Sequence, residues 1–157
     1  MKYIRLFESY IDTHMTTKSK ENFDMIKSHF DIPITFEHYM NGDHIFVCET
    51  FVGDSLAGVS ILNIRDRVMG NIDIPVDFKP PICHINYTLV DEDFRNIGIG
   101  RGLKQCILDF AKSKGCGVVS ARIEPSNYQS IRSIMSMGFV KNNKTDSGGM
   151  NTYYKLI

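Results

Sequence analysis

One segment of the sequence, residues 82–114, restricts the fold more than any other. Ile82 to Val90 is rich in residues that favour β-strands, and a turn with glycines at positions 98 and 100 follows it. From Gly100 to Lys114 the apolar side chains recur every three or four residues, which is typical of an amphipathic helix. The segment therefore predicts a strand, a glycine turn and a helix in direct succession. The apolar stripe of the helix consists of Leu103, Cys106, Ile107, Phe110 and Ala111.

The remainder of the chain alternates between helical and strand patterns, which fits a single α/β domain over residues 1–157. Lys18 to Phe30 has the spacing of a helix, and Ile45–Val52 with Leu56–Ile64 has that of a β-hairpin. The other predicted elements are a first strand at Tyr3–Phe7, a short strand near Ile72–Val76, a strand at Val118–Ile123, a helix at Gln129–Met137 with Ile131, Ile134 and Met135 inward, a strand from Gly138, a mobile loop at Asn142–Asn151 and a last strand at Thr152–Ile157.

Composition and charge argue against several classes of protein. The 18 basic residues balance 18 acidic ones, so there is no excess of positive charge of the kind that accompanies nucleic-acid binding. No apolar run approaches the roughly 20 residues that span a bilayer, and the apolar stretch of the first eight residues is too short for a secretory signal. The four cysteines form no C-x-x-C pair. We therefore expect free thiols, no metal site, a cytoplasmic location and no nucleic-acid or membrane partner.

The glycine turn has the chemistry of an anion-binding site. Gly98 and Gly100 let the backbone approach a ligand closely, and the first amides of the following helix attract anions. Arg95 and Arg101 flank the turn and Lys104 follows one helical turn later, which adds positive charge. The pattern suits a pyrophosphate, although a plain glycine turn between a strand and a helix would show the same residues.

The two most familiar phosphate-binding loops do not match this turn. A P-loop carries Lys-Ser or Lys-Thr after its second glycine, whereas Arg101-Gly102 stands here. A dinucleotide-binding fingerprint needs a third glycine where this chain has Leu103, and an acidic residue about 20 positions further on, where it has Ser120 to Arg122. The turn therefore belongs to another type.

The segment resembles the acetyl-CoA signature of the GNAT superfamily of N-acetyltransferases. That signature, R/Q-x-x-G-x-G/A, follows a strand ending in Val and opens the central helix; here it reads Arg95-Asn96-Ile97-Gly98-Ile99-Gly100. The family also has an Asn after the next strand, then a small residue, a short helix and a Gly-Phe pair. This chain carries Asn127, Ser130 and Gly138-Phe139 at those intervals. The resemblance is clear from residue 82 to residue 140.

The resemblance implies a GNAT-like α/β fold, with a mixed, mostly antiparallel sheet flanked by helices, and acetyl-CoA as co-substrate. Main-chain groups of the strand end would bind the pantetheine arm and polarise the thioester, and amides of the turn would hold the pyrophosphate. Asn127 would hydrogen-bond the cofactor arm, while capping the helix that follows is a second role open to it. The implied cofactor-binding residues are Thr88, Leu89, Val90, Arg95, Asn96, Ile97, Gly98, Ile99, Gly100, Arg101 and Asn127.

The chain departs from the family at the positions that often carry acid–base chemistry. Where members frequently have a Tyr four residues before the Gly-Phe pair, this chain has Ile134, and where many have a Glu on the strand before the Asn it has Arg122. His84 is a candidate replacement base, because histidine titrates near neutral pH; a surface or satisfied core histidine is the alternative. Glu124 is the second candidate, with pairing to Arg122 as its alternative. Tyr87, on the opposite side of a regular strand from His84, is expected in the core.

These observations predict an acetyl-CoA-dependent N-acetyltransferase that acts on a primary amine of a small molecule or of a protein. The departures at Ile134 and Arg122 leave a second hypothesis open, a catalytically silent acyl-CoA-binding or interaction domain of the same fold. No cluster of acidic residues marks a polycationic acceptor, so the acceptor stays unidentified. A homodimer is compatible with the sequence.

Overall fold

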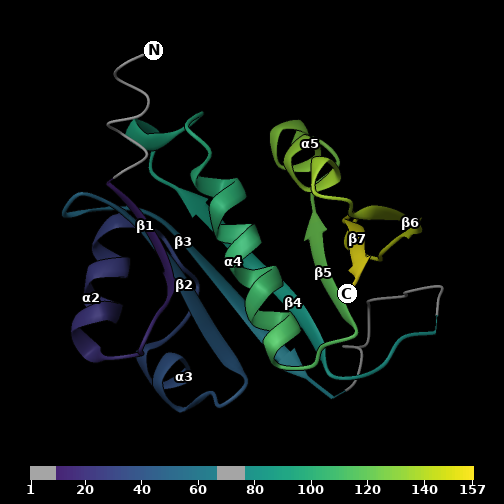
Figure 1. The fold of residues 1–157 in the computed structure, drawn as a ribbon, viewed down its shortest axis with the longest axis horizontal. Coiled ribbons are helices and arrows are strands. Elements are labelled where there is room, and N and C mark those ends of the chain that lie inside the picture. Colours follow the sequence, from purple (N-terminus) through teal and green to yellow (C-terminus); the bar gives the residue numbers. More distant parts are fainter. Residues whose placement is uncertain (1–9, 67–76) are drawn as a thin grey trace. The chain divides into compact units, whose positions relative to one another are not determined.

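The computed structural model describes residues 10–66 and 77–157. In this part of the chain, seven strands form one sheet in the order β1-β2-β3-β4-β5-β7-β6, accompanied by four α-helices and one short 3₁₀ helix (Figure 1). The strands are β1 (Ile11–Met15), β2 (Ile45–Val52), β3 (Ser55–Arg65), β4 (Ile82–Val90), β5 (Val118–Ile123), β6 (Val140–Thr145) and β7 (Asn151–Leu156). The helices are α2 (Lys20–His29), α3 (Phe36–Asn41), η1 (Glu92–Phe94), α4 (Ile99–Ser113) and α5 (Tyr128–Ser136).

The pairing of the strands confirms the predicted fold class. β1 pairs with β2, β5 with β7 and β6 with β7, all antiparallel. β4 and β5 run parallel, with Ile82 opposite Val118 and Ile85 opposite Ala121. A parallel pair needs a crossover connection, and the helix α4 lies between these two strands in the sequence, as such a connection requires.

Contacts divide the chain into two compact units. The first comprises Met1–Ile61 and Tyr87–Cys106, and the second comprises Leu62–Asn86 and Ile107–Ile157. Three elements, β3, β4 and α4, contribute residues to both units. The single domain over residues 1–157 stays a prediction, and each unit is described by itself.

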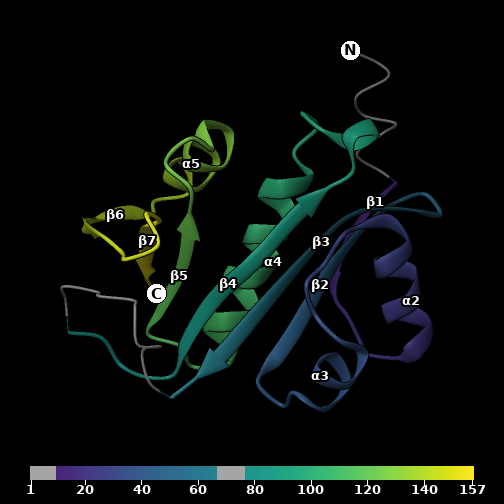
Figure 2. The same ribbon diagram turned by 180° about the vertical axis from the view of Figure 1, so that it is seen from behind.

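In the first unit, α2 and α3 cover one face of the strands β2 and β3 (Figure 2). Phe23 and Ile26 of α2 and Tyr39 of α3 pack with Val47 of β2 and Val59 of β3, and all five are at least nine-tenths buried. Ser19 caps α2 by accepting a hydrogen bond from the Asn22 N–H at 3.0 Å. Helix α2 thereby confirms the predicted helix at Lys18–Phe30, shortened slightly at both ends.

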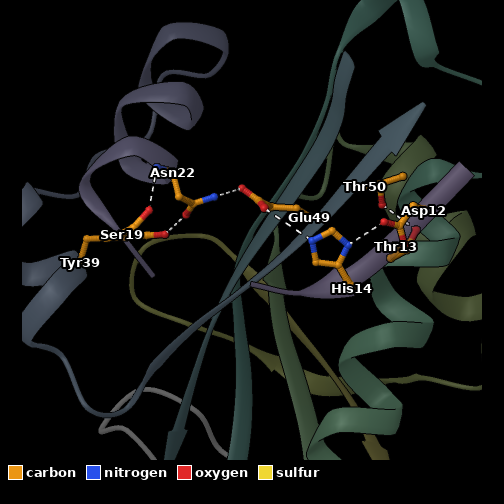
Figure 3. A network of polar contacts seen from close by, with 8 residues as sticks. All are labelled: Asp12, Thr13, His14, Ser19, Asn22, Tyr39, Glu49 and Thr50. Atoms are coloured by element: carbon orange, nitrogen blue, oxygen red, sulfur yellow. Dashed lines mark hydrogen bonds and ion pairs between the residues drawn. The ribbon is translucent and has the colours of Figure 1, made fainter. Parts of the chain in front are cut away.

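A polar network runs through this packing (Figure 3). Glu49 of β2 is 2% exposed, and its carboxylate accepts a hydrogen bond from the Asn22 side-chain amide. The Tyr39 hydroxyl donates to the Asn22 side-chain oxygen, and burial together with the charge of Glu49 raises the pKa of Tyr39. His14 Nε2 lies 4.0 Å from the Glu49 carboxylate, and its Nδ1 lies 3.2 Å from Asp12 Oδ2. Asn22 therefore links the two helices α2 and α3 to a buried carboxylate.

The second unit is built on β5 and β7. Six residues of β5, Val118–Ile123, face six of β7 in antiparallel register. Ile82, Val118 and Tyr154 form a buried cluster, with Phe78 packed against it. The strands β4 and β5 and the helix α4 match their predicted ranges within one residue. Gly115 adopts the left-handed conformation at φ 73° and its N–H donates to Lys112 O at 3.0 Å, a helix end of the glycine type.

Several details of the sequence prediction are wrong. The region expected to be a loop from Asn142 contains most of β6, so the connection to β7 comprises only residues 146–150. Met135 is 47% exposed instead of inward, and Met137, which follows α5, is buried. Every residue of β6 after Val140 is polar, which hides its strand character, and only one face of α5 meets the core. The predicted strands at Tyr3–Phe7 and Ile72–Val76 lie outside the described residues.

Besides the short 3₁₀ helix η1, two elements of the first unit were not predicted. β1 pairs with β2 over five residues but contains only two apolar side chains, Ile11 and Met15, and so lacks a strong strand signal. α3 has six residues, too few for a periodic stripe. Its visible signal is Thr35, whose hydroxyl accepts the His38 N–H at 3.2 Å as an N-cap.

We predict that Asn22→Ala lowers the free energy of unfolding by about 2–3 kcal/mol, because the buried Glu49 carboxylate loses its amide donor. Tyr39→Phe is the matched control: it removes only the hydroxyl donor to Asn22 and costs about 1 kcal/mol. Urea denaturation of the two variants measures both values. A loss for Asn22→Ala no larger than that for Tyr39→Phe would show that the carboxylate does not depend on this amide.

Candidate functional site: the glycine turn and the strand before it

The end of β4 has main-chain groups outside the ladder with β5. The register of these two strands covers Ile82 to Ile85 and extends no further. On its other side, β4 is fixed to β3: the Asp91 N–H donates to Ala57 O at 2.9 Å, and the Ser60 hydroxyl donates to Tyr87 O at 2.7 Å. Thr88, Leu89 and Val90 are half-buried although they belong to an internal strand of the sheet. Such a strand end offers backbone hydrogen-bonding groups to a ligand.

The turn after β4 depends on two residues with left-handed backbone. Asn96 has φ 64° and Gly98 has φ 90°. Asn and Gly are the residue types that adopt this conformation most readily, which explains their presence here. A Cβ atom on Gly98 would meet no other atom within 4 Å, so the space beside this glycine is open. The exposed Arg95 is held over the turn, with Nε 3.4 Å from Val90 O.

Helix α4 begins directly behind the turn. Its ladder of backbone hydrogen bonds starts with the Gly102 N–H, which donates to Gly98 O at 2.9 Å. The amides of Ile99 and Gly100 precede this first helical bond, and the positive end of the helix dipole lies at the same place. A phosphate group fits such a position without further assumptions, and the exposed Arg101 adds positive charge nearby.

Gly58 on β3 sets how closely α4 approaches the sheet, and the sequence analysis missed it. A Cβ atom at this position would lie 2.8 Å from Ile99 Cγ2 and 3.1 Å from Leu89 O. Only a glycine lets Ile99 and the end of β4 pack this tightly. The available signal was a glycine within an otherwise continuous strand pattern, which marks a close approach.

Asn127, in the second unit, has a structural role in the described residues. It is the N-cap of α5, and its side-chain oxygen accepts the Ser130 N–H at 3.2 Å. The capping alternative is thus confirmed. The bond uses the oxygen of the amide and not its NH₂ group, so the cap is compatible with the predicted contact to the cofactor arm, which stays a prediction.

His84 faces a polar neighbour on β5. Its Nδ1 lies 2.9 Å from Ser120 Oγ. Burial, and then the positive charges of Arg122 and Arg65, lower the pKa of His84 to about 4. The side chain is therefore neutral at pH 7 and has a nitrogen lone pair with which to accept a proton, but its conjugate acid is strong.

Arg122 is engaged with Asp146 and not with Glu124. Arg122 Nε lies 2.6 Å and Nη2 lies 2.5 Å from Asp146 Oδ2. Burial by itself raises the pKa of Asp146, but hydrogen bonds from the Met150 N–H, Arg122 and the Gly148 N–H outweigh it and lower that pKa. Glu124 is exposed just after β5. The ion pair thus ties β5 to the connection between β6 and β7.

The structure also places Ile134, Tyr87 and the four cysteines, for which the sequence analysis made predictions. Ile134 is fully buried, so the position where relatives often carry a tyrosine belongs to the core. Tyr87 is 38% exposed, and its placement in the core was wrong because the end of β4 is not covered on that side. All four cysteines are free thiols, as expected.

The described residues contain neither a metal-binding cluster nor a membrane-spanning helix. No group of three or more His, Cys, Asp or Glu side chains within residues 10–66 and 77–157 could hold a metal ion. Among the helices in the described part of the chain, none is both long and apolar enough to cross a membrane.

A mostly antiparallel sheet with one parallel pair, whose strand leads through a glycine turn into a helix, defines a CoA-dependent acyltransferase fold. The model of the acetyltransferase (GNAT) family matches residues 4–139, and the chain belongs to this family. This confirms the predicted class, an acetyl-CoA-dependent N-acetyltransferase. No curated protein matches the sequence.

Solved structures with the same fold share little sequence with the chain. Arabidopsis thaliana Naa50, in complex with a bisubstrate analogue, is 15% identical with a TM-score of 0.66, over 91% of this chain and 97% of that one. Aminoglycoside N-acetyltransferase AAC(6')-Iy, in complex with CoA, is 18% identical with a TM-score of 0.66, over 85% and 90%. The ribosomal-protein-S18-alanine N-acetyltransferase from Escherichia coli is 15% identical with a TM-score of 0.62, over 91% of each chain.

We predict that the Arg122–Asp146 pair stabilises the protein at neutral pH and ceases to do so in acid. Because the folded-state pKa of Asp146 is lowered, its contribution is complete above the ordinary pKa of 3.8 and is lost as the pH falls through the folded value. The melting temperatures of the wild type and Asp146→Asn should therefore differ at pH 5–7, and the difference should shrink as the pH falls below about 4 toward the folded pKa. Asn retains an acceptor for the loop amides. A difference that is constant down to pH 3 would contradict the ion-pair contribution.

Proposed function

We propose that the chain transfers the acetyl group of acetyl-CoA to a primary amine of a small molecule or of a protein. The observation that carries this proposal is the turn from Arg95 to Gly100, whose left-handed residues Asn96 and Gly98 lead the backbone into the start of α4. The strand end that precedes it lies beyond the register with β5. This combination suits a ligand with an extended amide-containing arm joined to a pyrophosphate.

In this proposal, the residues around the turn divide the binding of the cofactor between them. Amides of residues 96–101 hold the pyrophosphate, and the guanidinium groups of Arg95 and Arg101 add charge. Main-chain groups of Thr88, Leu89 and Val90 hydrogen-bond the pantetheine arm as an added strand would. The cofactor supplies an activated thioester, and the protein holds its carbonyl group where the amine can attack.

The chemical step forms a C–N bond, breaks the C–S bond and releases one proton and the CoA thiolate. The attacking nitrogen becomes cationic and much more acidic as the C–N bond forms, so even a weak base can take its proton. His84, neutral at pH 7, and Glu124 are the two candidate bases that we propose. The thiolate, with an ordinary thiol pKa near 8.5, can leave with little assistance, so the absence of a tyrosine at Ile134 is no obstacle.

The acceptor is proposed only as a class. Naa50 was solved with the bisubstrate analogue CoA-Ac-MVNAL, and another structural relative is an aminoglycoside acetyltransferase in complex with sisomicin. The same fold thus serves both peptide and small-molecule amines. We also propose a cytoplasmic location, which the four free thiols support. The homodimer stays a prediction.

We predict that Gly98→Asp weakens CoA binding by about 100-fold or more, because a carboxylate would stand beside the bound phosphates. Gly53→Asp is the matched control: Gly53 has φ 60° and open space around its Cβ position, but lies in the β2–β3 turn. It introduces the same charge and a similar backbone strain. Isothermal titration with CoA measures both variants. Equal affinities for CoA in the two variants would remove the turn as the binding site.

A catalytically silent CoA-binding domain remains the second candidate, favoured by the buried Ile134 and by the engagement of Arg122 with Asp146. Release of CoA thiol from acetyl-CoA, measured with a panel of α-amines and lysine amines, separates the two functions. Acceptor-dependent release supports the transferase. Tight binding of acetyl-CoA without any release supports the silent domain, and no binding of acetyl-CoA or CoA contradicts both.

We predict that His84→Gln lowers kcat by about 100-fold if His84 takes the proton. Because the pKa of His84 is about 4, the shape of the kcat/KM profile between pH 6 and 9 should be the same in the wild type and the variant. Ser120→Ala, which removes the partner of Nδ1, controls for loss of the hydrogen bond. An unchanged kcat in His84→Gln would leave Glu124 as the candidate base, to be tested as Glu124→Gln.

A further inference from the structure

Lys104 is a charged residue that the fold buries beside the glycine turn. It lies on α4 one turn after Gly100, and 6% of it is exposed. Its Nζ is 3.5 Å from Gly100 O and 3.8 Å from the position that a Cβ atom on Gly100 would take. That position is also 3.7 Å from Val90 Cγ2. The ammonium group therefore lies where the end of β4 meets the first turn of α4.

The buried position of Lys104 disfavours its charged form in the protein without a ligand. Burial lowers the pKa of Lys104, which means that its surroundings on balance disfavour the ammonium form. Lysine is among the side chains least often fully buried, and an apolar residue could occupy this stretch of α4 at lower cost. The ammonium group hydrogen-bonds Gly100 O within the fold, and an anion that binds beside the start of α4 would favour its charged form.

We propose that Lys104 is a positioning residue of the cofactor site, whose ammonium group draws the pyrophosphate of CoA onto the amides at the start of α4. The inference rests on the proposed function and adds a residue to it. Arg95 and Arg101 are exposed, so water and salt screen their charges. A buried ammonium is screened much less, and it acts on an anion from within the first turn of the helix.

Binding of CoA should also change the protonation of Lys104. A bound anion favours the charged form of a neighbouring amine and raises its pKa. Above the lowered pKa of the free protein, binding of CoA is therefore accompanied by uptake of a proton. The affinity for CoA falls as the pH rises through that lowered value, and below it the affinity no longer changes on account of Lys104.

Lys104→Met tests the residue, with Lys112→Met as the control, since Lys112 is an exposed lysine in the last turn of the same helix. We expect Lys104→Met to bind CoA about tenfold more weakly than wild type, and to bind pantetheine, which lacks the phosphates, as wild type does. The melting temperature of Lys104→Met without ligand should be equal to or above that of wild type, because a disfavoured buried charge is removed. Lys112→Met should match wild type in binding.

The outcomes separate the inference from the function on which it rests. If wild type binds no CoA, the proposed function fails. If wild type binds CoA and Lys104→Met binds it equally well, or loses CoA and pantetheine to the same extent, Lys104 has no role at the phosphates. Proton uptake is measured on wild type by titrating CoA in two buffers of different ionisation enthalpy, at pH values from neutral up to the ordinary lysine pKa of 10.5, which requires no variant. No uptake anywhere in that range would also overturn the inference.

Discussion

The reversal of the chain between β4 and α4 is the constraint on which the candidate site depends. Asn96 and Gly98 adopt a left-handed backbone, and this turns the chain so that the amides of the helix start follow directly on the strand end. Gly58 lets Ile99 approach within a distance that no side chain would allow. Strand, turn and helix are thus fixed to one another by backbone geometry, and the site needs few side chains to be formed.

The sequence predicted this part of the fold well because its signals are local. The composition of β4 predicts a strand, the spacing of apolar residues in α4 predicts a helix, and the glycines mark the turn between them. The sequence did not predict strands that form mainly because they pair with a neighbouring strand. β1 has only two apolar residues and is a strand because it pairs with β2. β6 is polar at most positions but pairs with β7. Tyr87 is 38% exposed, and no pattern within β4 reveals that.

Glu49 and Lys104 are buried charged side chains of the first unit, and their surroundings differ. Glu49 is surrounded by donors from Asn22 and by the nearby His14, so its burial is compensated within the fold and its role is structural. Lys104 is in the opposite situation, because the net effect of its surroundings is to lower its pKa. The hydrogen-bonded Glu49 secures the packing of α2 and α3, whereas the role that we propose for Lys104 would use its place beside the start of α4 and its lowered pKa.

Because the acid–base groups described in the second unit are weak, the protonation state of the acceptor amine becomes important. Ile134 offers no proton, and the low pKa of His84 makes it a weak base for a free ammonium. In the proposed reaction, an amine that relies on His84 would then have to lose its proton before it binds. At pH 7 an α-amine with a pKa of about 8 is roughly 10% neutral, whereas a lysine with a pKa of about 10.4 is neutral in well under 0.1% of molecules. At equal positioning, the neutral fraction alone would favour an α-amine over a lysine amine by about two orders of magnitude in the proposed reaction.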